Sequence, residues 1–180
     1  MNECYPSLGS QFAVLIIKPE AVQFADTITN YLYENHFAVV RRHQLVFPKE
    51  KLASFYDVVQ DPEWKPDKYF EHMTSGDSIV LFLSYENPTS DAQAELKRLI
   101  GDKNPDDART GTLRRSLRDP LKTKQPCLYV ENGKYWLNGV HCADNIMRAG
   151  YETCILYGGD ALYGEDIKDY LNPKTPVQLF

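Results

Sequence analysis

The chain has 180 residues, of which 43% are hydrophobic and 25% charged, and it carries a formal net charge of −5. This length predicts one compact domain with a sizeable core. The negative charge excludes the sequence-wide basic field that recruits nucleic acid or anionic membranes, so an anionic ligand must be held by a local cluster of cations.

The start of the chain, Met1-Asn2-Glu3-Cys4, has neither the basic stretch nor the apolar core of a signal peptide. No apolar run approaches the roughly twenty residues that a helix needs to cross a membrane. We therefore expect a soluble, cytoplasmic protein without a nucleic-acid or membrane partner.

The four cysteines, at positions 4, 127, 142 and 154, form no CxxC pair and show no metal-ligand spacing with a histidine. This pattern favours free thiols. The alternative is a catalytic or metal-binding thiol at Cys142, because it stands beside His141.

The first predicted strand is the apolar run 12–17, which shows no alternation and is therefore expected to be covered on both faces. It ends in Lys18-Pro19-Glu20, where proline extends the backbone before it and can open a helix after it. Lys18 thus stands at the carboxyl end of a central strand, where α/β proteins often place ligand-binding groups. The alternative is a solvated strand end.

Residues 25–36 carry apolar side chains at helical spacing, and 37–47 form a second strand. A helix opens at Pro48 and carries Tyr56 on its apolar face. Trp64 follows in a short segment bounded by prolines. A tryptophan there could stack on a flat ligand or could close the edge of the core.

A brief helix is predicted at 67–73, a buried strand at 78–85 and a helix at 89–100 that ends at Gly101. Repeated strand and helix units point to an α/β sandwich. No internal repeat is present.

The segment 102–115 is rich in turn residues and cations, and we expect a long loop that continues from 117 to 134. Arg114 can bind phosphate oxygens through its planar fork, with Lys97 and Lys103 as further charges. The alternative is a solvated charged loop. Within it, 128–130 and 135–137 are expected to pair as a small hairpin on an Asn-Gly turn.

The apolar run that begins at Tyr135 ends on His141, and a helix is predicted from about Asp144 to Tyr157. Glu152 lies eleven residues after His141, which is about three helical turns. A carboxylate that accepts a hydrogen bond from one imidazole nitrogen leaves the other nitrogen free as a nucleophile or base. A merely structural histidine is the alternative.

Four segments resemble, in the same order, motifs of the nucleoside diphosphate kinase family. Residues 18–22 resemble its Lys-Pro-Asp-Gly-Val turn, and 72–76 resemble its Met-x-Ser-Gly step. Residues 101–114 resemble its Gly-x-Thr-Asn-Pro…Pro-Gly-Thr-Ile-Arg loop, and 138–144 its Asn-x-x-His-Gly-Ser-Asp nucleophile motif. Glu152 stands at the family's distance from the histidine.

The resemblance implies an α+β fold, a ferredoxin-like αβ sandwich with a four-stranded antiparallel sheet covered by helices. It implies ping-pong transfer of the γ-phosphate of a nucleoside triphosphate, mainly ATP, to a nucleoside diphosphate, with Mg²⁺ bridging the phosphates and no protein metal site. A homo-oligomer is the expected assembly. The kinase-like domain is expected over 10–158, with an insertion at about 117–136 and a C-terminal extension at 159–180.

Each candidate site residue receives a role from the resemblance. His141 carries the phosphoryl group, Glu152 orients its ring, and Lys18 and Tyr56 lie near the transferred group. The nucleotide ligands that the resemblance implies are Lys18 and Asn138 on the ribose, Trp64 on the base, and Lys97, Lys103 and Arg114 on the phosphates.

The sequence departs from the family at several of these positions. Lys97 replaces an arginine and Lys103 a threonine, while Ala143 replaces a serine that helps to position the glutamate and Cys142 replaces a glycine. These changes leave two other readings open. One is a weakened kinase-like domain that serves as a structural or interaction module, and the other is a nucleotide sensor that turns over slowly.

Overall fold

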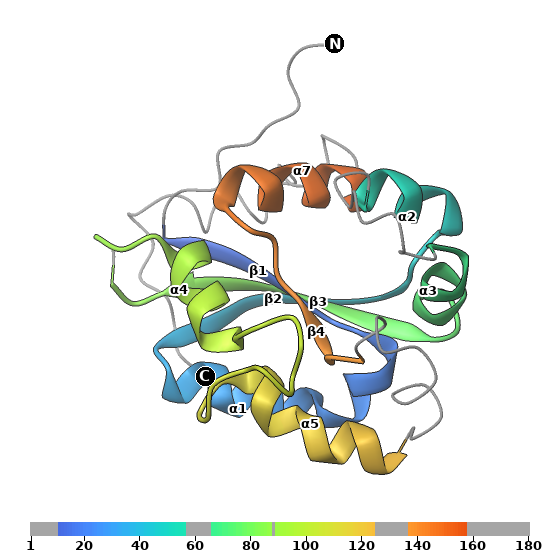
Figure 1. Cartoon of the computed structure of the whole chain (residues 1–180). Helices are drawn as coiled ribbons and strands as arrows, with labels where there is room; N and C mark the ends of the chain where they lie inside the picture. Colours follow the sequence, from blue (N-terminus) through green and yellow to red (C-terminus); the bar gives the residue numbers. More distant parts are fainter. Residues whose placement is uncertain (1–10, 57–65, 88, 125–136, 158–180) are drawn as a thin grey trace.

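The computed structural model describes residues 11–56, 66–87, 89–124 and 137–157 (Figure 1). Its sheet has four strands in the order β2-β3-β1-β4, and each neighbouring pair is antiparallel. The strands are β1 (Phe12–Ile17), β2 (Phe37–Val46), β3 (Asp77–Tyr85) and β4 (Val140–His141). The predicted four-stranded antiparallel sheet is confirmed, and β1 is a central strand.

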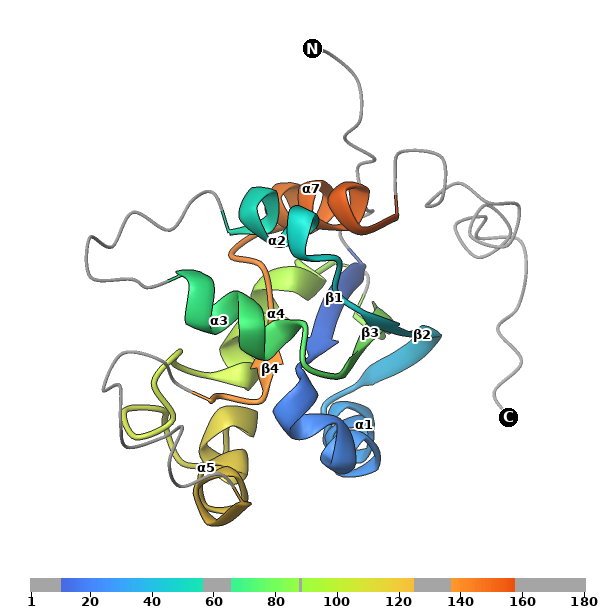
Figure 2. The same cartoon turned by 90° about the vertical axis from the view of Figure 1, so that its right-hand side faces the viewer.

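Helices cover both faces of the sheet, as Figures 1 and 2 show. On one face the core includes side chains of α1 (Ala25–Glu34), α4 (Ala92–Ile100) and α5 (Leu113–Lys124). On the other it includes side chains of α2 (Lys49–Phe55), α3 (Pro66–Met73) and α7 (Ile146–Tyr157). A short 3₁₀ helix, η1 (Pro19–Phe24), joins β1 to α1. This arrangement is the predicted ferredoxin-like αβ sandwich.

The side chains of β1 explain why the strand reads as a continuous apolar run. Ala13, Leu15 and Ile17 enter the core under α1, α4 and α5. Val14 and Ile16 enter the opposite core under α2, α3 and α7. Because successive side chains point to opposite faces, a strand covered on both sides needs apolar residues at every position.

The expected loop over 117–134 is wrong in its first part, because α5 occupies Leu113–Lys124. Leu113, Leu117 and Leu121 recur every fourth residue and are all buried in the core with α1 and α4. Pro120, which lies inside the helix, and the many charges favour a loop when the segment is read residue by residue. Burial of the leucine stripe outweighs the backbone hydrogen bond that proline cannot make.

Two further predictions concern the start of α4 and the hairpin before His141. Helix α4 begins at Ala92, three residues later than predicted, because Asp91 caps it by accepting a hydrogen bond from the Ala94 amide. The predicted hairpin falls largely on residues 125–136, which lie outside the described residues; Leu137 is described and is not in a strand. None of the helices in the described ranges is long and apolar enough to cross a membrane.

Candidate active site

His141 lies on the second residue of β4, and its cross-strand partner is Ile16. Cross-strand partners share a face, so the imidazole points toward the core that α2 and α7 cover. Its ring centroid is 5.1 Å from that of Phe55 and 5.7 Å from that of Tyr56. With 19% of its side chain exposed, the ring is held by packing but remains open to a ligand.

Glu152 of α7 also contacts the ring. The distance between His141 Nε2 and Glu152 Oε2 is 2.8 Å. Because a carboxylate only accepts hydrogen bonds, Nε2 must carry the proton, and Nδ1 of the neutral ring is left with its lone pair. The predicted pairing of these two residues is therefore present in the geometry.

Arg148 completes this arrangement, although the sequence reading did not single it out. Its Nε donates to Glu152 Oε1 at 3.1 Å, so both oxygens of the carboxylate accept a hydrogen bond. Its Nη2 also donates to the carbonyl of Phe55 at the end of α2. The signal that could have revealed it is the spacing of four between an arginine and a glutamate on one helix.

Lys18 and Asn138 meet beside this cluster. Lys18 Nζ donates to Asn138 Oδ1 at 2.6 Å, and both residues are buried. Asn138 Nδ2 donates in turn to the backbone carbonyl of Lys103 at 2.9 Å. The end of β1, the approach to β4 and the segment after α4 are thereby tied together.

A second carboxylate, that of Glu20, contacts the backbone just before β4. Glu20 accepts a hydrogen bond from His72 Nε2 at 2.7 Å and another from the Gly139 amide at 3.2 Å. Burial by itself would raise the pKa of Glu20, but the bond from His72 and the charge of Lys18 outweigh it and lower the pKa. Glu20 is therefore an ionised buried anchor for the strand that carries His141.

Tyr56, at the end of α2, shares a 2.8 Å hydrogen bond with the hydroxyl of Tyr69 on α3. Burial raises the pKa of Tyr56 well above its ordinary value, with Tyr69 adding to the effect. The hydroxyl therefore stays neutral and can donate to an anion at physiological pH. Lys18 Nζ lies 5.4 Å from the centre of the Tyr69 ring, which places a cation at the same spot.

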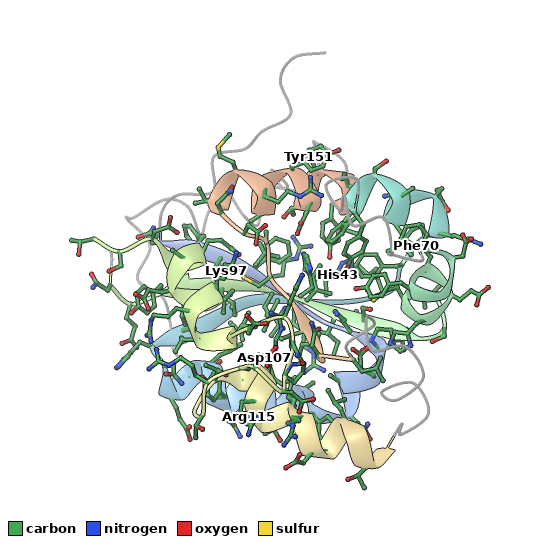
Figure 3. All side chains as sticks on the ribbon, in the orientation of Figure 1. His43, Phe70, Lys97, Asp107, Arg115 and Tyr151 are labelled. Atoms are coloured by element: carbon green, nitrogen blue, oxygen red, sulfur yellow. The ribbon has the colours of Figure 1, made fainter. Side chains whose placement is uncertain are left out.

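Lys97 of α4 forms an ion pair with Asp144, which precedes α7. Half of the lysine side chain is exposed, so the pair lies at the surface. The hydrogen bond from Lys97 lowers the pKa of Asp144. In Figure 3 Lys97 lies to the left of β4 and Phe70 to its right.

The guanidinium of Arg114, near the start of α5, crosses toward β4. Its Nη1 donates to the Gly101 carbonyl and its Nη2 to the Val140 carbonyl, both at 3.0 Å. Burial lowers the pKa of this guanidinium. Nε has no hydrogen-bond partner among the described residues. Arg114 thus carries donor capacity next to the residue that precedes His141.

Gln93 is a second residue that sequence reasoning missed. It is fully buried in α4, accepts from the Val14 amide at 3.0 Å and donates to the Ala143 carbonyl at 3.0 Å. It also donates to the Cys142 sulfur at 2.9 Å. Burial raises the pKa of Cys142 to about 12, so its thiol stays protonated at neutral pH. This argues against a catalytic thiol there.

The structure therefore gathers most of the predicted site residues around His141. Glu152 and Tyr56 are in contact range of the ring, and Lys18, Asn138, the Lys103 backbone and Arg114 border β4 or its approach. Trp64 lies outside the described residues. In the described ranges, no group of three His, Cys, Asp or Glu side chains could hold a metal ion.

Comparison with known protein families identifies the family of this chain. Residues 11–161 match the family described as nucleoside diphosphate kinase, which is most of the chain. The chain belongs to the nucleoside diphosphate kinase family. A member of this family is a transferase, a kinase that acts on nucleotides.

Relatives named nucleoside diphosphate kinase support the assignment. The one from Pelobacter propionicus is 33% identical over 102 residues, which cover 56% of this chain and 71% of the relative. The one from Syntrophotalea carbinolica is 30% identical over 148 residues, or 80% of this chain and 93% of the relative. The second alignment spans nearly the whole length of the relative.

Solved nucleoside diphosphate kinases share the fold. The apo enzyme from Encephalitozoon cuniculi superposes with a TM-score of 0.63 at 21% identity and covers 89% of this chain and 98% of its own. The Aquifex aeolicus enzyme superposes with a TM-score of 0.64 at 22% identity, and the match covers 84% of this chain and 97% of that enzyme. At this identity the likeness shows a common fold.

Proposed function

We propose that the protein moves the γ-phosphoryl group of a nucleoside triphosphate, mainly ATP, to a nucleoside diphosphate through a phosphorylated His141. The observation that carries this proposal is the 2.8 Å bond from His141 Nε2 to Glu152, which leaves the Nδ1 lone pair available for attack. Family membership supplies the class of substrate.

In the first half-reaction, Nδ1 attacks the γ-phosphorus, the N–P bond forms, and the P–O bond to the departing nucleoside diphosphate breaks. The Nε2 proton stays in place. The imidazole becomes positively charged, and Glu152, only 9% exposed, compensates that charge. In the second half-reaction a β-phosphate oxygen of the acceptor attacks phosphorus, and the electrons of the N–P bond return to Nδ1.

The surrounding cations and hydroxyls would bind the nucleotide. Arg114, Lys97 and Lys103 would hold phosphate oxygens, Lys18 and Asn138 the ribose hydroxyls, and Tyr56 the phosphoryl group in transit. Lys97 must leave Asp144 to do so, which is a modest cost for an exposed ion pair. Trp64 would stack on the base, which tolerates every nucleobase because each has a π-face.

Mg²⁺ would arrive with the nucleotide as part of the substrate. Bound to the phosphates, its charge would offset theirs during the transfer. We further propose that the protein acts in the cytoplasm as a homo-oligomer.

The deciding experiment is incubation of the purified protein with γ-labelled ATP and magnesium, followed by a chase with excess GDP. Wild type should acquire acid-labile label within seconds and pass it to GDP, whereas His141→Ala should acquire none. Label that is acid-stable, or that persists in His141→Ala, would contradict the proposed route.

The alternative is a kinase-like module without useful turnover, favoured by the engagement of Lys97 with Asp144 and by the missing hydroxyl at Ala143. Such a module would bind a nucleotide without becoming labelled. It would also retain any protein partner equally well in wild type and in His141→Ala. A protein that is labelled but passes its phosphate to GDP only over minutes would be the slow sensor.

A further inference from the structure

Arg148 and Glu152 stand one turn apart on α7, and both are largely shielded from water. Their side chains are 15% and 9% exposed, and Arg148 Nε donates to Glu152 Oε1 at 3.1 Å. An exposed ion pair of this spacing contributes little, but a shielded one with direct hydrogen bonds fixes the two side chains strongly. The pair is therefore built as part of the site interior.

Contacts to several groups hold the guanidinium of Arg148 in place. Besides Glu152, it donates through Nη2 to the Phe55 carbonyl, and its central carbon lies 4.8 Å from the centre of the Tyr151 ring. Phe55 itself packs against the His141 ring at 5.1 Å. Arg148 thus connects α7 to the end of α2, where Phe55 packs against the histidine.

We call the contact of Arg148 with Glu152 the clamp, and the second oxygen of Glu152 shows how this clamp acts on His141. Oε2 accepts from His141 Nε2, and rotation of the carboxylate would lengthen that bond. Arg148 restrains the rotation by holding Oε1. Ala143, which is buried in the segment between β4 and α7, offers no hydroxyl that could substitute.

We propose that Arg148 is a positioning residue for phosphoryl transfer, acting on His141 through Glu152. It fixes the plane of the carboxylate, and the carboxylate in turn keeps the ring proton on Nε2 and the lone pair on Nδ1. This inference rests on the proposed function, because it assumes that Nδ1 is the phosphoryl acceptor.

The test compares Arg148→Met with wild type in single-turnover labelling by γ-labelled ATP. We expect the rate of phosphorylation to fall about ten- to a hundredfold, by analogy with the loss of an outer hydrogen-bond partner of a metal-binding histidine. The ATP concentration at half-maximal rate should stay within about twofold, because Arg148 acts through Glu152. The control is Arg98→Met, which breaks an exposed arginine–glutamate pair on α4 and should leave the rate unchanged.

Nitrogen NMR of the His141 ring gives a readout that general destabilisation would not move. In folded wild type the neutral ring should carry its proton on Nε2, and in Arg148→Met a mixture of tautomers should appear. Arg148→Lys, which keeps a charged donor beside Glu152, should restore most of the rate. Should Arg148→Met fail to fold, Arg148→Leu takes its place, since it also removes every donor to Glu152 and keeps an apolar side chain on α7.

An unchanged rate and unchanged tautomer in Arg148→Met, or in Arg148→Leu where that variant is used, would overturn the assignment. So would an Arg148→Lys protein that folds normally yet is as slow as Arg148→Met with a normal tautomer, because the role would then be structural support of α2. Failure of wild type to be labelled would instead refute the proposed function, and the NMR comparison would still test the clamp.

Discussion

Lys18 and Asn138 are joined by a 2.6 Å hydrogen bond between Nζ and the side-chain oxygen, although 120 residues separate them. They are only 4% and 6% exposed, so the lysine charge has little water to solvate it. A buried charge depends on its partner more than an exposed one does. The bond therefore fixes the end of β1 against the approach to β4.

Asn138→Ala should lower the free energy of unfolding by about 2 kcal/mol, because it leaves a buried ammonium without its acceptor. Urea denaturation measures this. The control is Gln44→Ala, which removes an exposed hydrogen bond to Asp77 and should change stability by less than about 0.5 kcal/mol. Equal losses in the two variants would contradict the interpretation.

Glu20 should make stability depend on acid pH. Its pKa in the folded state is lowered below the ordinary 4.5, so its contribution is fully present above that value and is lost as the pH falls through the folded-state pKa. Near neutral pH the free energy of unfolding of wild type should exceed that of Glu20→Gln by about 1.5–3 kcal/mol, as expected for hydrogen bonds to a charged group. The gap should close in acid, measured by urea denaturation across pH.

The matched control for Glu20 is Glu86→Gln. Glu86 also pairs with a histidine, His36 at 3.0 Å, but its side chain is 71% exposed. Its replacement should change stability little at any pH. A gap between wild type and Glu20→Gln that stays constant down to strong acid would show that the carboxylate charge is not what stabilises the strand.

The sequence predicted those features that depend on local periodicity. The spacing from His141 to Glu152 gave the pairing that the structure contains, and the unbroken apolar run 12–17 gave a strand covered on both faces. Both follow from rules that relate residue spacing to direction in space. The position of Lys18 at a strand end likewise needed only the proline after it.

What the sequence did not reveal depends on contacts between distant segments. In the sequence Gln93 is an ordinary polar residue of a helix. Its role depends on the fold, because its side chain accepts from the Val14 amide of β1 and donates to the Ala143 carbonyl after β4. Likewise, the hydrogen bond from Arg148 to the Phe55 carbonyl forms only because the fold places the end of α2 beside α7. Helix α5 was obscured by Pro120, whose local cost is outweighed by burial of leucines that only the folded core provides.

Cys142 should resist alkylation in the native protein. With its pKa raised to about 12, only about one molecule in ten thousand carries the reactive thiolate near pH 8. Iodoacetamide treatment followed by peptide mass mapping should find Cys142 unmodified in native protein and modified in urea. Rapid native modification would mean that the thiol is not shielded by its contact with Gln93.

Gly139 lies two residues before His141, and its backbone conformation and close packing both restrict substitution. It has a φ of +74°, and a Cβ there would lie 2.9 Å from a methyl of Leu117 and 3.2 Å from the Cβ of Ala21. Its carbonyl also accepts from the Lys18 amide. An alanine therefore meets both an unfavourable backbone conformation and a filled space.

Gly111→Ala separates these two costs, because Gly111 has a φ of +88° but nothing within 4 Å of the added carbon. We expect Gly111→Ala to lose about 1 kcal/mol and Gly139→Ala about 2–4 kcal/mol in thermal or urea unfolding. Gly139→Ala should also slow labelling of His141, since relief of the clash displaces β4. If both variants lose the same stability and keep the wild-type labelling rate, close packing at Gly139 does not hold the histidine in place.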